Sequence, residues 1–168
     1  MVKAPIFRHN DSLGLSVLDQ NLFIDDDGSM YMYYSIYDTG IMQYIIGVSM
    51  LDPVTPDWDT YKILVRPGEL TPKTTSTNML IWEAYQGFKV AEGPFMVKSP
   101  VNGKYYLTYS VNHYPDRYYT VCYAYSDEPL GDFTKPYKKG EQWTNLLFGY
   151  AGGMKSTTVY DKWEGFMS

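Results

Sequence analysis

Cysteine and histidine are both scarce in this sequence of 168 residues. The single cysteine, Cys122, has no partner for an internal disulfide, and the sequence contains neither a Cys-x-x-Cys pair nor the His/Cys spacing of a zinc site. Cys122 lies in an apolar stretch, where a buried, unreactive thiol is expected. These absences exclude a disulfide-stapled scaffold and a structural zinc domain.

Features of membrane and nucleic-acid-binding proteins are also missing. No run of about 18 apolar residues occurs, so no transmembrane helix and no membrane partner are expected. The N-terminal segment MVKAPIFRHNDS lacks the apolar region of a signal peptide, yet both a cytoplasmic and a secreted location stay open. Lysine and arginine number 14 against 19 acidic residues, and this net charge of -5 argues against nucleic acid as a partner.

Aromatic residues, in contrast, are abundant, at 17% of the sequence with 18 tyrosines. Tyrosine favours strands and half-buried surfaces, which points to an all-β fold. No segment shows sustained helical periodicity, and 10 prolines and 14 glycines interrupt the chain throughout. Aromatic rings also suit sugar binding, but a β-rich core explains most of them.

The chain contains an internal repeat. FIDDDGSMYMYYS (23–35) and VKSPVNGKYYLTYS (97–110) share the pattern Gly-x-x-Tyr-x-x-Tyr-Ser, and each glycine follows the Asp or Asn of a predicted hairpin turn. The similarity continues from YIIGVSMLDPVTPDW (44–58) to TVCYAYSDEPLGDF (120–133), and a weaker copy begins at residue 157. Each unit therefore predicts a hairpin, a third strand and a proline-containing turn, and DTYKILV (59–65) is the candidate fourth strand.

Four antiparallel strands per repeated unit are the construction of a β-propeller blade. We expect two units, at approximately 14–66 and 88–140, with a partial blade over 141–168. A propeller needs four or more blades, so the prediction is part of a propeller in a single domain.

Each unit carries an acidic residue near its first strand. Asp19 precedes Phe23 by four residues, and Glu92 precedes Phe95 by three. Inner strands line the channel of a propeller, so carboxylates at the starts of two such strands are expected to converge. Paired carboxylates in an aromatic setting are the equipment of glycoside hydrolysis, although an acidic residue at a strand start is more often a turn or edge residue. At Glu92 the following Gly93-Pro94 constrains the backbone and hence the direction of the carboxylate.

These segments together resemble glycoside hydrolase family 43. The resemblance rests on LDQNLFIDDDG, on EGPF followed by NGKYYLTYS, and on SDEPLGDF, and it covers roughly residues 14 to 140. It implies a five-bladed propeller that cleaves arabinofuranosyl or xylosyl linkages of plant cell-wall polysaccharides or oligosaccharides with inversion. Family sites use three carboxylates: a general base, a pKa-modulating aspartate and a general acid.

Carried over by position, the resemblance implies that Glu92 is the general acid and Asp19 the pKa-modulating aspartate. Gln20 stands where the family usually has proline. The general base belongs to an earlier blade, and no segment before Asp19 resembles it; Asp11, the only upstream aspartate, is not assigned.

Three further residues are candidates for substrate binding: His113, Phe23 and Trp82. His113 follows the second tyrosine-rich strand, where an idle exposed histidine is the alternative. Trp82, like Phe88, lies in the connection that leads into Glu92, where core packing competes with stacking on a sugar.

No cofactor or metal is predicted. The run Asp25-Asp26-Asp27-Gly28 lacks the ligand alternation and distal glutamate of a calcium loop and predicts a solvated hairpin turn. Family members often carry a histidine in the last blade that helps to hold a central metal, and Met154 occupies that position here, which argues against bound calcium.

Two functions follow as hypotheses. The first is a glycosidase whose missing base comes from elsewhere, including a second copy of the chain that completes the ring as a homo-oligomer. The second is a non-catalytic carbohydrate-binding or assembly protein built on a degenerate or truncated half propeller. Both predict an oligosaccharide or polysaccharide partner.

Overall fold

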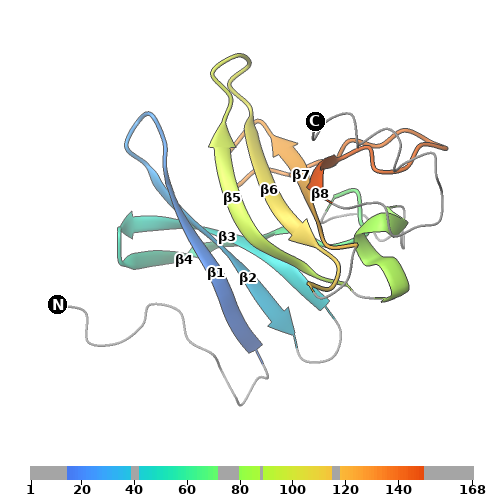
Figure 1. Ribbon diagram of the computed structural model, residues 1–168. Coiled ribbons are helices and arrows are strands. Elements are labelled where there is room, and N and C mark those ends of the chain that lie inside the picture. The colour runs from blue at the N-terminus through green and yellow to red at the C-terminus, as the bar shows by residue number, and fades with distance from the viewer. Residues whose placement is uncertain (1–14, 39–41, 72–79, 88, 115–117, 150–168) are drawn as a thin grey trace.

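The computed structural model describes residues 15–38, 42–71, 80–87, 89–114 and 118–149. They form two four-stranded antiparallel sheets and one short 3-10 helix, so the all-β prediction is confirmed (Figure 1). The part of the chain that is described contains no helix with the length and apolar character needed to cross a membrane. The first sheet contains β1 (Leu15–Ile24), β2 (Met30–Asp38), β3 (Met42–Asp52) and β4 (Thr55–Val65); η1 (Ile81–Gly87) follows; the second contains β5 (Ala91–Lys98), β6 (Tyr105–Val111), β7 (Thr120–Ser126) and β8 (Leu146–Gly149).

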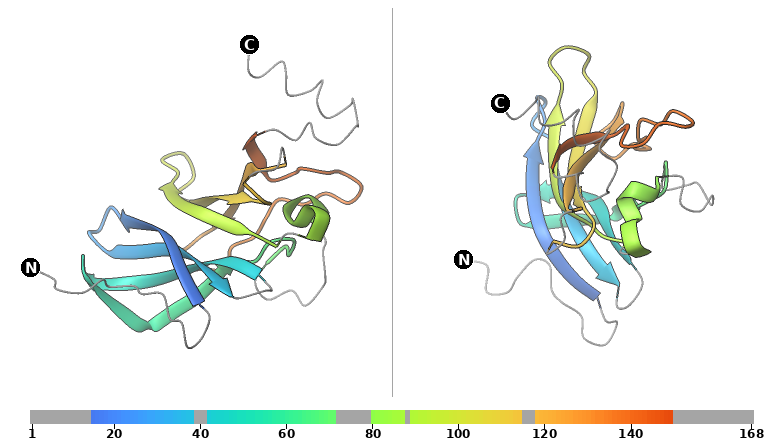
Figure 2. Two further views of the ribbon diagram at one scale, coloured as in Figure 1. Left: turned by 60° about the horizontal axis from the view of Figure 1, so that its bottom comes forward. Right: turned by 45° about the vertical axis from the view of Figure 1, so that its right-hand side comes forward.

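In each sheet the strands follow one another in chain order, which is the arrangement of a propeller blade. We call β1–β4 sheet A and β5–β8 sheet B; they lie as two neighbouring layers, and β5 contacts β1, β2 and β3 (Figure 2). Both predicted hairpin turns are present, with Gly28 at φ 85° and Gly103 at φ 70°. β8 lies in the range 141–168, for which we expected the start of another blade, and it supplies the fourth strand of sheet B instead.

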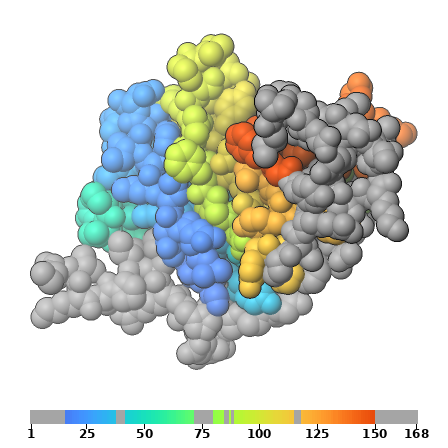
Figure 3. Space-filling model, viewed as in Figure 1, coloured from blue at the N-terminus to red at the C-terminus, as the bar shows by residue number. Residues whose placement is uncertain are grey.

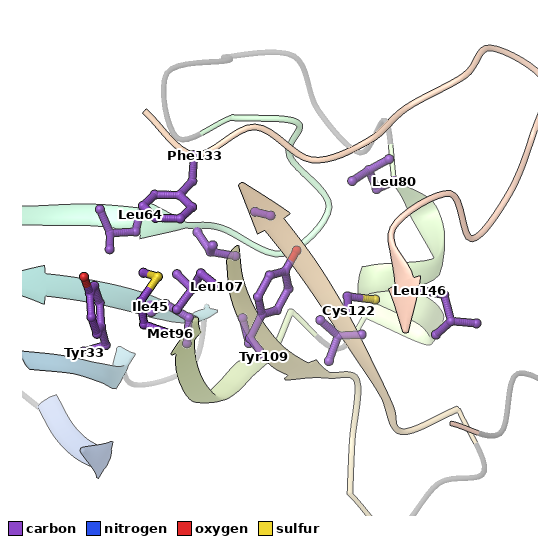
Figure 4. Packing of buried hydrophobic residues seen from close by; sticks show 14 of the residues in the cluster. Tyr33, Ile45, Leu64, Leu80, Met96, Leu107, Tyr109, Cys122, Phe133 and Leu146 are labelled. Atoms are coloured by element: carbon purple, nitrogen blue, oxygen red, sulfur yellow. The ribbon is translucent and has the colours of Figure 1, made fainter. Parts of the chain in front are cut away.

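The main core lies between the two sheets because alternate residues of each strand point to the same side. Tyr33 and Ile45 of sheet A meet Met96, Leu107 and Tyr109 of sheet B (Figure 4). Cys122 belongs to this core and is fully buried, as predicted. Burial raises the pKa of its thiol well above the ordinary value, and the nearby Glu83 charge adds to the effect.

Sheet A is apolar on both faces. Its second face carries another cluster of buried side chains from β2 and β3: Met32, Tyr34, Ile36, Ile46, Val48 and Met50. On the first face, the side chains of Leu64 and Leu130 pack directly on Gly47, where a Cβ atom would lie only 2.6 Å from both. Two apolar faces are what a blade needs in order to pack between two neighbours.

Candidate active site

The two sheets carry a β-bulge at the same place in their first strands. The pairing of β1 with β2 is interrupted between Leu18 and Asn21, and that of β5 with β6 between Glu92 and Phe95. Asp19 and Gly93 follow the last residue that is paired before the bulge, and both have left-handed backbones, with φ of 56° and 60°. A bulge turns side chains away from the regular alternation and leaves backbone groups unpaired.

The bulges show that Asp19 and Glu92 are not equivalent. Glu92 pairs with Ser110, and the serine that matches Ser110 in the repeat, Ser35, pairs with Leu18. Glu92 therefore corresponds to Leu18. The expectation that both carboxylates stand at strand starts is right for Glu92, the second residue of β5, and wrong for Asp19, the fifth residue of β1.

The two carboxylates are nevertheless brought together. The backbone N–H of Gly93 donates to Oδ2 of Asp19 at 3.0 Å. Farther along β5, the N–H of Met96 donates to Oδ1 of Asn21 at 3.3 Å. Side chains of β1 thus accept hydrogen bonds from the backbone of β5. The two strands lie side by side (Figure 3, blue beside yellow-green). The carboxylate of Asp19 is held at the residue that directly follows Glu92.

The carboxylate of Glu92 is half-buried and accepts a hydrogen bond on each oxygen. Nε2 of Gln43 donates to Oε2 at 3.1 Å, and the hydroxyl of Tyr119 donates to Oε1 at 2.7 Å. Burial, the hydrogen bond to Glu92 and the negative charges of Glu92 and Asp19 raise the pKa of Tyr119 to about 12, while a hydrogen bond with Ser110 opposes them. Tyr119 thus keeps its proton at neutral pH and remains a donor.

Neither Gln43 nor Tyr119 is among the residues that the sequence predicted for the site. The repeat nevertheless contains the signal, because the matching segments begin at residues 44 and 120, directly after these two residues. The strand register agrees: Ile45 pairs with Ser35, and Val121 pairs with Ser110. Gln43 and Tyr119 are therefore equivalent residues of the two units, and both donate to one carboxylate.

The predicted substrate-binding residues lie in different surroundings. Trp82 is only 2% exposed, and its indole N–H donates to Oδ1 of Asn145 at 2.9 Å. It is part of the core, so the prediction that it stacks on a sugar is wrong. Phe23 is half-buried and packs edge-on against Tyr105, with ring centroids 6.2 Å apart, at the hairpin end of β1. Its packing is that of a core-edge residue.

The role of His113 in substrate binding stays a prediction. His113 follows β6 at the end of sheet B where Ala91 pairs with Val111, which is also the end that carries Glu92. Its ring lies 5.5 Å from that of the exposed Tyr114. Phe88, Asp11 and Met154 lie outside the described residues.

The acidic hairpin of sheet A is only partly solvated. Asp26 and Asp27 are exposed as predicted, but Asp25 accepts hydrogen bonds from Lys98 at 2.7 Å and from the hydroxyl of Tyr105 at 2.5 Å. Burial alone would raise the pKa of Asp25; the hydrogen bonds from Lys98, Tyr105 and the Asp26 backbone outweigh it, so the net pKa is lowered. Asp25 thus anchors sheet A to sheet B. Among the described residues, no three His, Cys, Asp or Glu side chains form a group that could hold a metal ion.

A buried ion pair fixes the connection between the sheets. Glu83 of η1 is fully buried, and Nζ of the equally buried Lys135 donates to its Oε2. The other oxygen accepts from the hydroxyl of Tyr109 at 2.8 Å and from Nδ2 of Asn145 at 2.6 Å. The N–H of Gly68 completes the set at 3.0 Å. This network holds η1 and Gly68 against sheet B, and the sequence had indicated none of it.

Comparison with known proteins points to one family. The family model "Glycosyl hydrolases family 43" matches residues 4–145. A beta-D-galactofuranosidase of Aspergillus niger is 29% identical over 126 residues, which are 75% of this chain and 29% of that protein. The crystal structure of an endo-1,4-beta-xylanase from Bacteroides thetaiotaomicron is 37% identical with a TM-score of 0.62, over 82% of this chain and 40% of that one. That of a thermostable family-43 glycoside hydrolase is 29% identical with a TM-score of 0.63, over 86% and 42%. The chain thus spans about two fifths of these solved relatives.

Proposed function

Because the chain belongs to glycosyl hydrolase family 43, we propose that it carries the proton-donating part of an inverting glycosidase site for arabinofuranosyl or xylosyl linkages. In this proposal Glu92 is the general acid, and Asp19 modulates and orients it. The observation that carries the proposal is the hydrogen bond from the Gly93 N–H to the carboxylate of Asp19, at the residue next to Glu92. Relatives described as a xylanase and a galactofuranosidase support a carbohydrate substrate.

The chemistry assigned to Glu92 is a single proton transfer. Its protonated carboxyl gives the proton to the glycosidic oxygen while the bond from that oxygen to the anomeric carbon breaks. A water attacks the anomeric carbon from the opposite face and passes its own proton to a base. Among the described residues, no third carboxylate is hydrogen-bonded to Asp19, Glu92, Gln43 or Tyr119. Since no segment of the sequence resembles the family's base, we assign the base to a carboxylate from elsewhere, either from a further part of the same protein or from a second copy of this chain.

The test is hydrolysis of two kinds of substrate by the purified chain and its Glu92→Gln variant. An aryl glycoside with an acidic phenol needs little protonation to leave, whereas an oligosaccharide needs it fully. Glu92→Gln should therefore lower turnover of xylo- or arabino-oligosaccharides by about 100-fold or more and that of the activated aryl glycosides by much less. Glu128→Gln, at an exposed glutamate after β7, is the matched control and should behave as wild type.

Three results would count against the proposal. Equal losses on both kinds of substrate would point to general damage, and unchanged turnover in Glu92→Gln would exclude Glu92 as the acid. Calorimetric binding of oligosaccharides without any hydrolysis would favour the second candidate, a non-catalytic carbohydrate-binding protein. The absence of a third carboxylate from the described cluster is the observation that favours this alternative.

A further inference from the structure

We infer that Gln43 and Tyr119 are positioning residues that fix the orientation of the Glu92 carboxylate. This inference rests on the proposed role of Glu92 as the acid. It adds two residues from two different sheets to the site, and the repeat places them at equivalent positions.

The geometry leaves the carboxylate little freedom. Gln43 and Tyr119 bind different oxygens, Oε2 at 3.1 Å and Oε1 at 2.7 Å, so rotation of the carboxylate would break both hydrogen bonds. The backbone before the side chain is constrained as well, since Ala91 and Glu92 pair with β6 and the bulge begins directly after them. Both the direction and the rotation of the group are therefore set.

Each donor is itself held in place. Gln43 is only 5% exposed, its backbone N–H donates to the carbonyl of Lys89 at 2.8 Å, and it bridges Val90 in parallel fashion. It thus ties the start of β3 to the two residues that precede β5. Tyr119 directly precedes β7, an inner strand of sheet B, and hydrogen-bonds with Ser110, the cross-strand partner of Glu92. Donors that are fixed in this way orient an acceptor better than mobile ones.

The two donors have different chemistry. An amide nitrogen can only donate, whereas a tyrosine hydroxyl can donate or accept. Both donate to the ionised carboxylate, and hydrogen bonds to a charged group are the stronger kind. When Glu92 gains a proton on Oε1, Tyr119 can accept it in a hydrogen bond while Gln43 still holds Oε2. The pair therefore keeps one orientation of Glu92 through both protonation states.

The first experiment separates a positioning role from a structural one. Tyr119→Phe and Gln43→Met remove one donor each with little change in shape. Each should lower kcat by about tenfold, the size of one hydrogen bond to a charged group, with KM unchanged. Each substitution removes a hydrogen bond to the ionised carboxylate, so the alkaline limb of the pH–rate profile should move to higher pH than in the wild type. The control is Tyr123→Phe, at a half-buried tyrosine of β7 whose ring centroid lies 6.1 Å from that of Tyr106. It should leave kcat and the pH–rate profile unchanged.

A second experiment does not depend on activity. With ¹³C-labelled glutamate, the carboxyl signals of the six glutamates can be followed against pH by NMR, and Glu92→Gln identifies the signal of Glu92. That signal should titrate at higher pH in Tyr119→Phe and Gln43→Met than in the wild type, and not in Tyr123→Phe.

The outcomes distinguish the inference from the proposed function. If neither variant moves the Glu92 signal, the inference is wrong, whatever the activities are. If the signal moves but neither the wild-type chain nor its self-associated form hydrolyses a glycoside, the two hydrogen bonds are confirmed and the non-catalytic alternative is favoured over the proposed function. If thermal stability falls in both variants while the Glu92 signal and the pH profile stay where they are, the two residues are structural and the inference is overturned.

Discussion

Sheets A and B have the same strand order and the same bulge, yet their side chains differ at three equivalent positions around the site. Leu18 corresponds to Glu92, Asp19 to Gly93, and Gln43 to Tyr119. A shared backbone therefore delivers different groups to one place. Sheet B supplies the candidate acid, sheet A the neighbouring carboxylate, and each sheet one donor. In a repeated fold, the positions that point to function are therefore those at which the equivalent residues of the two copies differ.

The sheets also differ in how they are anchored, and this predicts the largest effect on stability. Sheet B is tied to the connection between the sheets through the buried pair Glu83–Lys135. Glu83→Ala removes one partner and leaves the Lys135 ammonium buried without its counter-charge. We expect the free energy of unfolding to fall by about 3–5 kcal/mol, measured by urea denaturation.

The double variant Glu83→Leu/Lys135→Leu is the matched control for that prediction. It removes both charges and replaces them with apolar side chains, so it should recover part of the stability lost in Glu83→Ala. A loss below about 1 kcal/mol in Glu83→Ala would show that the pair behaves like a surface ion pair, and the contrast between the sheets would disappear.

A smaller effect is expected where Asp19 faces Gly93. Asp19→Gly gives sheet A the residue that sheet B has at this position. It relieves a left-handed backbone that costs a non-glycine residue about 1–2 kcal/mol, and it removes the acceptor of the Gly93 N–H, a loss of about the same size. The free energy of unfolding should therefore change by less than about 1 kcal/mol, while hydrolysis falls because the second carboxylate is gone.

Asp19→Asn separates charge from geometry at the same position. The amide oxygen can still accept from the Gly93 N–H, so it keeps the hydrogen bond and loses only the charge. If Asp19 acts through its charge, Asp19→Asn and Asp19→Gly should lose similar activity in the hydrolysis assay. Full activity in Asp19→Asn would mean that only the hydrogen bond matters.

The sequence predicted the backbone better than the site, and the reason is physical. Hairpin turns and strands depend on local residues, so Gly28, Gly103 and the tyrosine alternation sufficed to predict two four-stranded units. Aligning Asp19 with Glu92 failed because Phe23 and Phe95, the residues that anchored the alignment, are not equivalent: Asn21 pairs with Tyr33 as Phe95 pairs with Thr108. The prediction for Trp82 failed for another reason. From the sequence alone, a tryptophan of the core cannot be told from one that stacks on a sugar. Only the structure shows that its indole N–H donates to Asn145.

The contacts with Glu92 depend on long-range packing and could not be read locally. Gln43 lies 49 residues before Glu92 and Tyr119 lies 27 after it. Their equivalence in the repeat was visible in the sequence, but it could not say that both side chains point to one carboxylate. That convergence comes from the way sheet B packs on sheet A.

The smallest expected effect concerns the hairpin anchor and depends on pH. The folded-state pKa of Asp25 is lowered, so its contribution to stability is present above the unfolded pKa, about 3.9, and is lost as pH falls through the folded value. Asp25→Asn should lower the melting temperature at pH values above about 5, and the gap to wild type should close at lower pH.

Asp26→Asn is the matched control, since Asp26 contacts the same Lys98 ammonium at 2.8 Å but its side chain is 85% exposed, against 7% for Asp25. Because water screens the exposed partner, Asp26→Asn should change the melting temperature less at every pH, and equal losses in the two variants would show that burial does not distinguish them.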